Sequence, residues 1–216
     1  MRKVKAVTWF CLCFVLLFAL TASYTAVAQE KPIKIGLQAP ITGHWAYEGE
    51  MAKNSVEVAL QMIEEQGGIL GGRKIEIVIA DDASNPRDSA LAAQRLVSQR
   101  VAAVIGTYGS SVNEPAADIY EANKMIDIGY GSTAVKLTMA KERKYFFRTC
   151  GRDDVQGEFF SEYAVGTMKA RRIAIMHDNT TFALGVAEEA KRALKQYIDA
   201  GVAELVFYDA ITPGEK

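Results

Sequence analysis

Small polar residues follow two segments of the sequence that have the pattern of β-strands. Ser110 and Ser111 come shortly after one of them, and Gly131, Ser132 and Thr133 come shortly after the other. Hydroxyl groups, free backbone N–H groups and the positive end of a helix dipole together bind anions such as a carboxylate. These residues therefore indicate a site for a small anionic solute. Helix capping by Ser111, and solvation of Ser110 and Thr133 in loops, explain the same pattern equally well.

Aromatic residues follow two other predicted strands. Trp45 and Tyr47 come after the first strand, and Phe182 comes after the sixth. Aromatic rings can cover the apolar body of a ligand. A packed surface ring is the commoner explanation of a residue such as Trp45.

The sequence motifs of common enzyme classes are not satisfied. Residues 67–74 resemble a phosphate loop, but Arg73 stands where that loop needs Lys, and the segment runs from helix to strand. Residues 129–134 fit a loose dinucleotide pattern, but they follow the fourth predicted strand instead of the first. The Gly-x-Ser-x-Gly motif of many hydrolases does not occur in the sequence. We therefore expect no catalysis and no cofactor.

Isolated reactive residues have simpler explanations. His177 and Asp178 are adjacent at a strand end, where neighbouring side chains point apart, so a surface loop is favoured over a catalytic pair. Asp81 and Asp82 could bind a metal, but a turn in which one of the two carboxylates caps a helix is the favoured explanation. Cys150 has no neighbouring His and is expected to be a small buried apolar residue.

Alternating strand and helix patterns in the sequence predict where these residues lie in the fold. Strands are predicted at 33–37, 74–80, 101–105, 125–128, 145–148, 172–176 and 204–208, and helices at 52–63, 86–99, 111–122, 153–169 and 184–199. Repeated β-α units predict an α/β fold with open parallel sheets flanked by helices. Ligands of such sheets bind at the carboxyl ends of the strands, which is where the polar and aromatic residues lie.

The N-terminal residues predict export. A basic start, an apolar run and the small residues Ala26-Val27-Ala28 indicate a secretory signal peptide, residues 1–28, that is cleaved after Ala28. The apolar run is shorter than a membrane span, which disfavours an uncleaved anchor, and lipid attachment at Cys11 or Cys13 lacks a cleavage site. The expected location is the periplasm.

Composition limits the partners and the size of the fold. Half of the 216 residues are hydrophobic and 24% are charged, which argues against disorder. The 25 basic side chains do not exceed the 26 acidic ones, so no general affinity for nucleic acid is expected. Residues 29–149 are predicted to form a ligand-binding lobe, and residues 150–216 the start of a second lobe. Because two strands bury little surface, we expect the second lobe to be incomplete and the natural protein to continue beyond Lys216.

Several segments, in the same order and spacing, resemble the leucine/isoleucine/valine-binding-protein family of periplasmic receptors. The matching segments are 33–43, 67–72 (Gly-Gly-Ile-Leu-Gly-Gly), 81–86, 104–106, 115–121, 148–157, 172–178 and 207–216. The resemblance implies a two-lobed type I periplasmic-binding fold, truncated here. It also implies a monomeric receptor that captures an amino acid, branched-chain or related, between its lobes and delivers it to an ABC permease in the inner membrane.

The same resemblance implies roles for individual residues. Ser110 is expected to hold the carboxylate of the ligand, and the Gly131 carbonyl its ammonium group. Thr133 is expected to bind through its N–H and hydroxyl groups, with Ser132 between these two residues. Phe182 is expected to close over the ligand from the second lobe.

The sequence departs from the family at three positions. Glu48, beside Tyr47 and Trp45, stands where the family often has Tyr, so a polar or cationic ligand is an alternative to a branched-chain one. Ser84 and Gly109 stand where some members have a pair of Cys. A receptor for an amide, urea or aromatic acid, and the sensory ectodomain of a membrane receptor, remain open alternatives.

Overall fold

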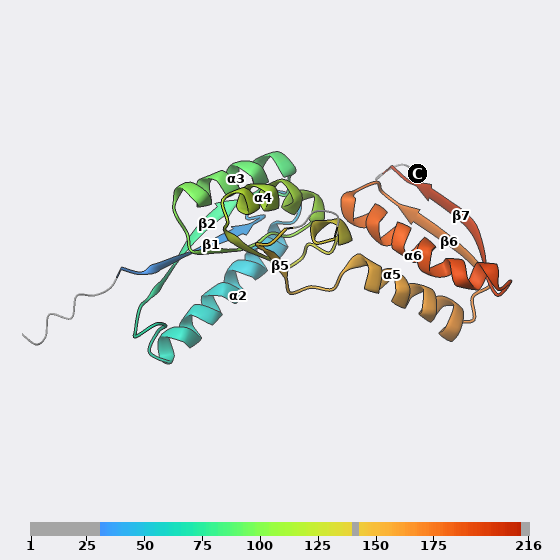
Figure 1. The fold of residues 1–216 in the computed structure, drawn as a ribbon, viewed down its shortest axis with the longest axis horizontal. Helices are drawn as coiled ribbons and strands as arrows, with labels where there is room; N and C mark the ends of the chain where they lie inside the picture. Colours follow the sequence, from blue (N-terminus) through green and yellow to red (C-terminus); the bar gives the residue numbers. More distant parts are fainter. Residues whose placement is uncertain (1–30, 140–142, 213–216) are drawn as a thin grey trace, which may run out of the picture. The chain divides into compact units, whose positions relative to one another are not determined.

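The computed structural model describes residues 31–139 and 143–212 (Figure 1). The predicted signal peptide, residues 1–28, lies outside the described residues. The elements from Ile33 onward alternate between strands and helices, as the sequence pattern predicts.

A five-stranded parallel sheet positions the loops and helix starts that bear most of the candidate site residues. In the order β2-β1-β3-β4-β5, its strands are Ile75–Asp81, Ile33–Ala39, Ala103–Ile105, Ile126–Gly129 and Phe146–Arg148. Leu37, Ile105 and Ile128 are aligned across β1, β3 and β4. The α/β fold with an open parallel sheet is therefore confirmed.

Three helices cover this sheet. Helices α3 (Pro86–Ser98) and α4 (Ser110–Ala122) pack against each other on one face, and α2 (Ala46–Glu65) lies on the other face (Figure 1). The core beneath α3 and α4 consists of Ala80, Ala92, Ala93, Leu96, Val101, Val104, Ala116 and Tyr120. Small side chains on the two helices let them approach each other and the sheet closely.

The helix termini agree only partly with the sequence prediction. Asn85 caps α3 directly before the predicted first residue, Pro86, since its side chain accepts a hydrogen bond from the Asp88 N–H at 2.9 Å. Ser89, Ala92, Ala93 and Leu96 form the buried face of α3. Helix α4 begins at Ser110 with Gly109 as its N-cap, so the predicted cap at Ser111 was wrong.

The second sheet has two parallel strands, β6 (Arg172–His177) and β7 (Glu204–Ala210). The helices α5 (Asp153–Glu162) and α6 (Thr181–Asp199) accompany it, and a π-helical turn at Tyr163–Thr167 extends α5. In residues 31–139 and 143–212, no helix has both the length and the apolar character needed to cross a bilayer.

Candidate functional site

The loops that follow β3 and β4 lie side by side. An isolated parallel bridge pairs Tyr108 with Gly131, and the Gly109 N–H donates to the Gly131 carbonyl at 3.2 Å. Residues 110 and 131–133, which are 21 or more positions apart in the sequence, therefore meet at one edge of the sheet. This edge is the carboxyl end of the strands, where ligands of open α/β sheets bind.

Two of the predicted ligand-binding hydroxyls join these loops to each other. Ser110 is 1% exposed, and its Oγ accepts a hydrogen bond from the Ala134 N–H at 3.1 Å. Ser132 is fully buried, and its Oγ donates to the Thr107 carbonyl at 2.9 Å. Both side chains thus hold the shape of the site, and Ser110 still has a hydroxyl proton to donate.

Thr133 differs from these two serines. Its hydroxyl oxygen is buried, faces the Asp153 carboxyl and makes no hydrogen bond of normal geometry with any described residue. Burial raises the pKa of Asp153, while the Thr133 hydroxyl and the Arg148 charge act against that rise. The Thr133 hydroxyl and the Asp153 carboxyl therefore face each other where the loop after β4 meets the start of α5.

The N-terminus of α4 adds backbone donors at the same edge. Gly109, with φ of 86°, turns the chain from the end of β3 into this helix. The N–H groups of the first helical turn have no partner within the helix, and the helix dipole places partial positive charge there. The arrangement favours a carboxylate beside Ser110.

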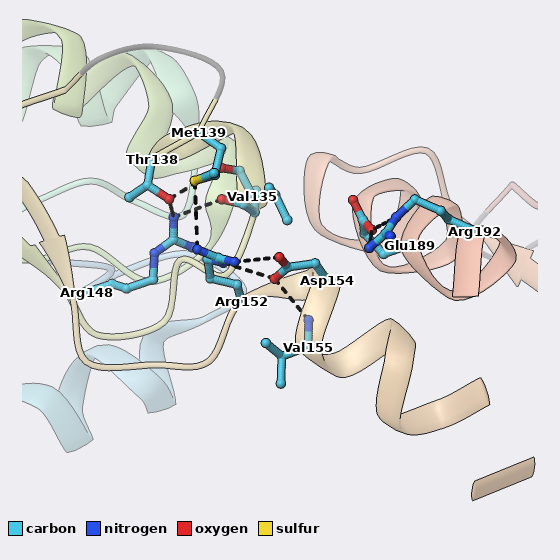
Figure 2. Close-up of polar contacts among 10 residues, drawn as sticks. Val135, Thr138, Met139, Arg148, Arg152, Asp154, Val155, Glu189 and Arg192 are labelled. Carbon is cyan, nitrogen blue, oxygen red and sulfur yellow. Dashed lines mark hydrogen bonds and ion pairs between the residues drawn. The ribbon is translucent and has the colours of Figure 1, made fainter. Parts of the chain in front are cut away.

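Arg148, which the sequence analysis did not select, holds the loop after β4 in place. Its guanidinium donates to the carbonyls of Ser132 at 2.9 Å and Ala134 at 3.1 Å. It also donates to the Thr138 hydroxyl at 2.9 Å (Figure 2). The same group lies 5.4 Å from the centre of the Phe146 ring. An Arg at the last position of a strand was the only signal in the sequence.

A separate ion pair lies beyond this loop. Arg152 contacts the Asp154 carboxylate through two nitrogens, at 3.0 and 2.6 Å, at the start of α5 (Figure 2). The hydrogen bonds from Arg152 lower the pKa of Asp154. Because the Asp154 carboxylate stays charged at neutral pH, it stabilises the N-terminal end of α5, where the helix dipole is positive.

Aromatic rings cover the two glycines of the paired loops. A Cβ added to Gly109 would overlap the Trp45 ring, and one added to Gly131 would overlap the Tyr108 ring. The Trp45 and Tyr108 rings meet edge to face at 5.4 Å, and the Tyr108 and Tyr130 rings are 6.2 Å apart. The Trp45 ring thus lies against the paired loops, together with Tyr108 and Tyr130, which the sequence did not indicate.

The remaining predicted site residues lie on helices. Tyr47 and Glu48 belong to the first turn of α2, and Tyr47 is 71% exposed. Phe182 belongs to the first turn of α6, beside the second sheet, and its ring is 46% exposed. These residues were predicted in loops, and both helices begin several residues earlier than the apolar spacing indicated.

The paired aspartates after β2 organise the loop before α2. Asp81 accepts hydrogen bonds from the Thr42 N–H and hydroxyl, and Asp82 accepts from the Ser84 N–H and the Thr107 hydroxyl. Burial raises the pKa of Asp82 to about 6, although these hydrogen bonds oppose the rise. The predicted turn is present, but neither carboxylate caps α3, because Asn85 does.

His177 is also placed differently from the prediction. It ends β6, is 7% exposed, and its ring lies 5.4 Å from the Tyr208 ring. Its Nδ1 accepts from the Asn179 N–H at 3.3 Å, while Asp178 accepts from the Thr180 N–H. The expected surface loop was wrong for His177, which is packed and turned away from Asp178.

Comparison with known proteins places this fold among solute receptors. Residues 32–211 match the family model described as periplasmic binding protein. The chain is 36% identical over 198 residues to the leucine-specific-binding protein of Salmonella typhimurium, and 34% identical over 199 residues to a Leu/Ile/Val-binding protein homologue of Brucella melitensis. Each alignment covers 92% of this chain and 52% of the relative, so the chain spans about half the length of the curated relatives it matches.

Solved structures agree with this assignment. The branched-chain amino acid transporter substrate-binding protein LivJ of Streptococcus pneumoniae, in complex with isoleucine, superposes with a TM-score of 0.75 at 26% identity. That superposition covers 86% of this chain and 51% of LivJ. The leucine-binding protein LivK of Thermotoga maritima gives a TM-score of 0.74 at 25% identity, covering 85% and 50%. The resemblance found in the sequence is confirmed, and the chain belongs to the periplasmic binding protein family.

Proposed function

We propose that this protein is an extracytoplasmic receptor that captures a free amino acid, branched-chain or related, and delivers it to an ABC permease. The names of its relatives, a leucine-specific-binding protein and a Leu/Ile/Val-binding protein homologue, support this ligand class. In this proposal the signal peptide is cleaved after Ala28, the mature protein resides in the periplasm, and the ligand leaves chemically unchanged.

The observation that carries the proposal is a group of polar atoms at the carboxyl edge of the five-stranded sheet. We call this group, which consists of the Thr133 hydroxyl, the first turn of α4 and the Gly131 carbonyl, the anchor. The Thr133 hydroxyl, which faces the Asp153 carboxyl, follows β4, and the first turn of α4 follows the adjacent strand β3. The Gly131 carbonyl lies between them and accepts one hydrogen bond, from Gly109. Because a carbonyl oxygen has two lone pairs, it can also accept from an ammonium group. One short loop pair thus offers donors for an α-carboxylate and an acceptor for an α-ammonium.

Ligand-dependent thermal unfolding tests this function. The protein encoded by the natural gene, at its full length, is purified without ligand and heated with each of the common L-amino acids. A ligand present at about 100 times its Kd stabilises the folded state by about 2.7 kcal/mol, which raises Tm by several degrees. At least one branched-chain or related amino acid is expected to do so. Failure of every amino acid to raise Tm would contradict the proposal.

A further inference from the structure

Three rings form one continuous surface beside the anchor. We call Trp45, Tyr108 and Tyr130 the aromatic wall. Its neighbouring rings lie 5.4 and 6.2 Å apart, within the range of ring–ring contact. Because Trp45 covers Gly109 and Tyr108 covers Gly131, the wall is in contact with the backbone of the two loops that bear the anchor. A ligand held at the anchor has this wall beside it.

A carboxylate without a partner lies near the aromatic wall. Glu48 is only partly exposed, three residues after Trp45, and no hydrogen bond or ion pair joins it to the part of the chain that the structure describes. The Tyr130 hydroxyl is buried and likewise has no partner among those residues. Burial, followed by the charges of Asp82, Tyr108 and Glu48, raises the pKa of Tyr130, so Glu48 is within electrostatic range of that hydroxyl.

The position of Glu48 also suits a purely structural role. An acidic residue in the first turn of a helix complements the helix dipole, and Glu48 occupies such a position in α2. That role needs neither the aromatic rings nor the buried Tyr130 hydroxyl. It also leaves the carboxylate free, because interaction with the dipole does not use up the lone pairs of the oxygens.

Aromatic faces combined with a carboxylate are the chemistry that binds organic cations. The negative face of each ring attracts a cation within about 6 Å of its centre, and a carboxylate supplies a charge-assisted hydrogen bond. An aliphatic side chain would gain only the contact with the rings and would leave Glu48 and Tyr130 without partners. An anionic side chain would be repelled by Glu48.

We propose that the aromatic wall and Glu48 form the side-chain subsite of the receptor, and that this subsite prefers an amino acid with a cationic side chain, such as a guanidinium or ammonium group. This inference rests on the proposed function, since it assumes that the anchor holds the α-carboxylate and α-ammonium groups. It assigns this receptor a ligand class that differs from the leucine, isoleucine and valine in the names of the relatives.

Calorimetric titration of the full-length gene product with three probes tests the preference. L-arginine and L-citrulline have nearly the same shape, but only L-arginine is cationic, and L-leucine represents the aliphatic ligands. L-arginine is expected to bind about 10- to 100-fold more tightly than L-citrulline, the range for one hydrogen bond between charged groups. Glu48→Gln keeps the shape of the side chain and is expected to reduce this ratio to within about threefold of unity.

Glu50→Gln is the matched control, because Glu50 is an exposed acid on the same helix, two residues later. It should leave the ratio as in the wild type. The subsite inference is overturned, and the receptor function stands, if L-leucine binds but L-arginine binds no more tightly than L-citrulline. The same holds if Glu48→Gln leaves the ratio of the L-arginine and L-citrulline affinities unchanged. If neither these probes nor any other amino acid binds, the proposed function itself fails.

Discussion

The Asp127 carboxyl is the least satisfied polar group in the five-stranded sheet. It is 1% exposed in β4, and neither of its oxygens has a hydrogen-bond partner among the described residues. Burial raises the pKa of Asp127 well above its usual range, and the Arg143 charge only partly opposes this. A carboxyl with a raised pKa in the folded state stabilises the protein below its unfolded pKa, about 3.9, and that stabilisation is lost as pH rises through the folded value.

Asp127→Asn should therefore stabilise the protein at neutral pH and have little effect near pH 4. Each kcal/mol gained raises Tm by about 2–4 °C in a domain of this size. Thermal unfolding of wild type and variant between pH 4 and 8 measures the difference. Asp199→Asn is the control, because Asp199 is an exposed partner of Lys195 and should change Tm little at any pH. A variant that is less stable than wild type at pH 7 would show that the Asp127 charge is satisfied.

Thr133 and Ser132 are adjacent but should respond differently to loss of the hydroxyl. Thr133→Val removes a hydroxyl that faces the Asp153 carboxyl without a hydrogen bond of normal geometry, so the Tm of the unliganded protein should change little, while amino acid affinity falls about 10- to 100-fold. Ser132→Ala removes the bond to the Thr107 carbonyl and should cost about 1–3 kcal/mol of stability. Calorimetric unfolding and ligand titration separate the two effects. Unchanged affinity in Thr133→Val would remove Thr133 from the anchor.

At the scale of elements, the loop after β4 depends on the strand that follows it. Arg148, at the end of β5, bonds three acceptors in residues 132–138, and its planar guanidinium spreads its donors in a way that a Lys ammonium does not. Arg148→Lys should therefore speed hydrogen exchange in residues 131–138 and weaken amino acid binding. Arg192→Lys is the control, since Arg192 pairs with Glu189 on the surface of α6 (Figure 2). Equal rates of hydrogen exchange in residues 131–138 of both variants would contradict the role given to Arg148.

The order of strands and helices could be predicted from sequence because it depends on local pattern. Apolar alternation marked the strands, and Asn85-Pro86 marked the start of α3. The starts of α2 and α6 were missed because their first turns contain exposed residues that add no apolar period, such as Tyr47 and Phe182. Which face of such a helix is buried depends on tertiary packing, and the apolar pattern of the sequence alone does not contain that information.

The site was predictable only where residues follow a strand directly. Ser110 and Thr133 could be proposed from the sequence because ligands of α/β sheets bind at the ends of the strands. Tyr108 and Tyr130 were missed because they meet only through the pairing of β3 with β4. Arg148 was missed for the same reason, since its partners are 10 to 16 residues away in the sequence.

At the scale of the whole molecule, the second sheet exposes large apolar side chains. Met176 and Phe207 in its strands are 62% and 46% exposed, and Phe160 on the accompanying helix α5 is 52% exposed. Exposed apolar patches promote association, and two-stranded sheets have unprotected edges. Residues 29–216 expressed alone should therefore self-associate and bind amino acids poorly, which size-exclusion chromatography with light scattering and titration would show. A monodisperse monomer with the affinity of the full-length gene product would contradict this expectation.

The central claim is that the edge of the five-stranded sheet holds a free amino acid by its α-carboxylate. Titration of the full-length gene product with its best amino acid ligand, and with the methyl ester of that amino acid, tests this claim most directly. The ester keeps the side chain and the ammonium group but has no full negative charge for the α4 N-terminus. The account predicts that the ester binds at least about tenfold more weakly, since a hydrogen bond to a charged group is worth about 1.5–3 kcal/mol. Equal affinity for the acid and the ester would contradict it.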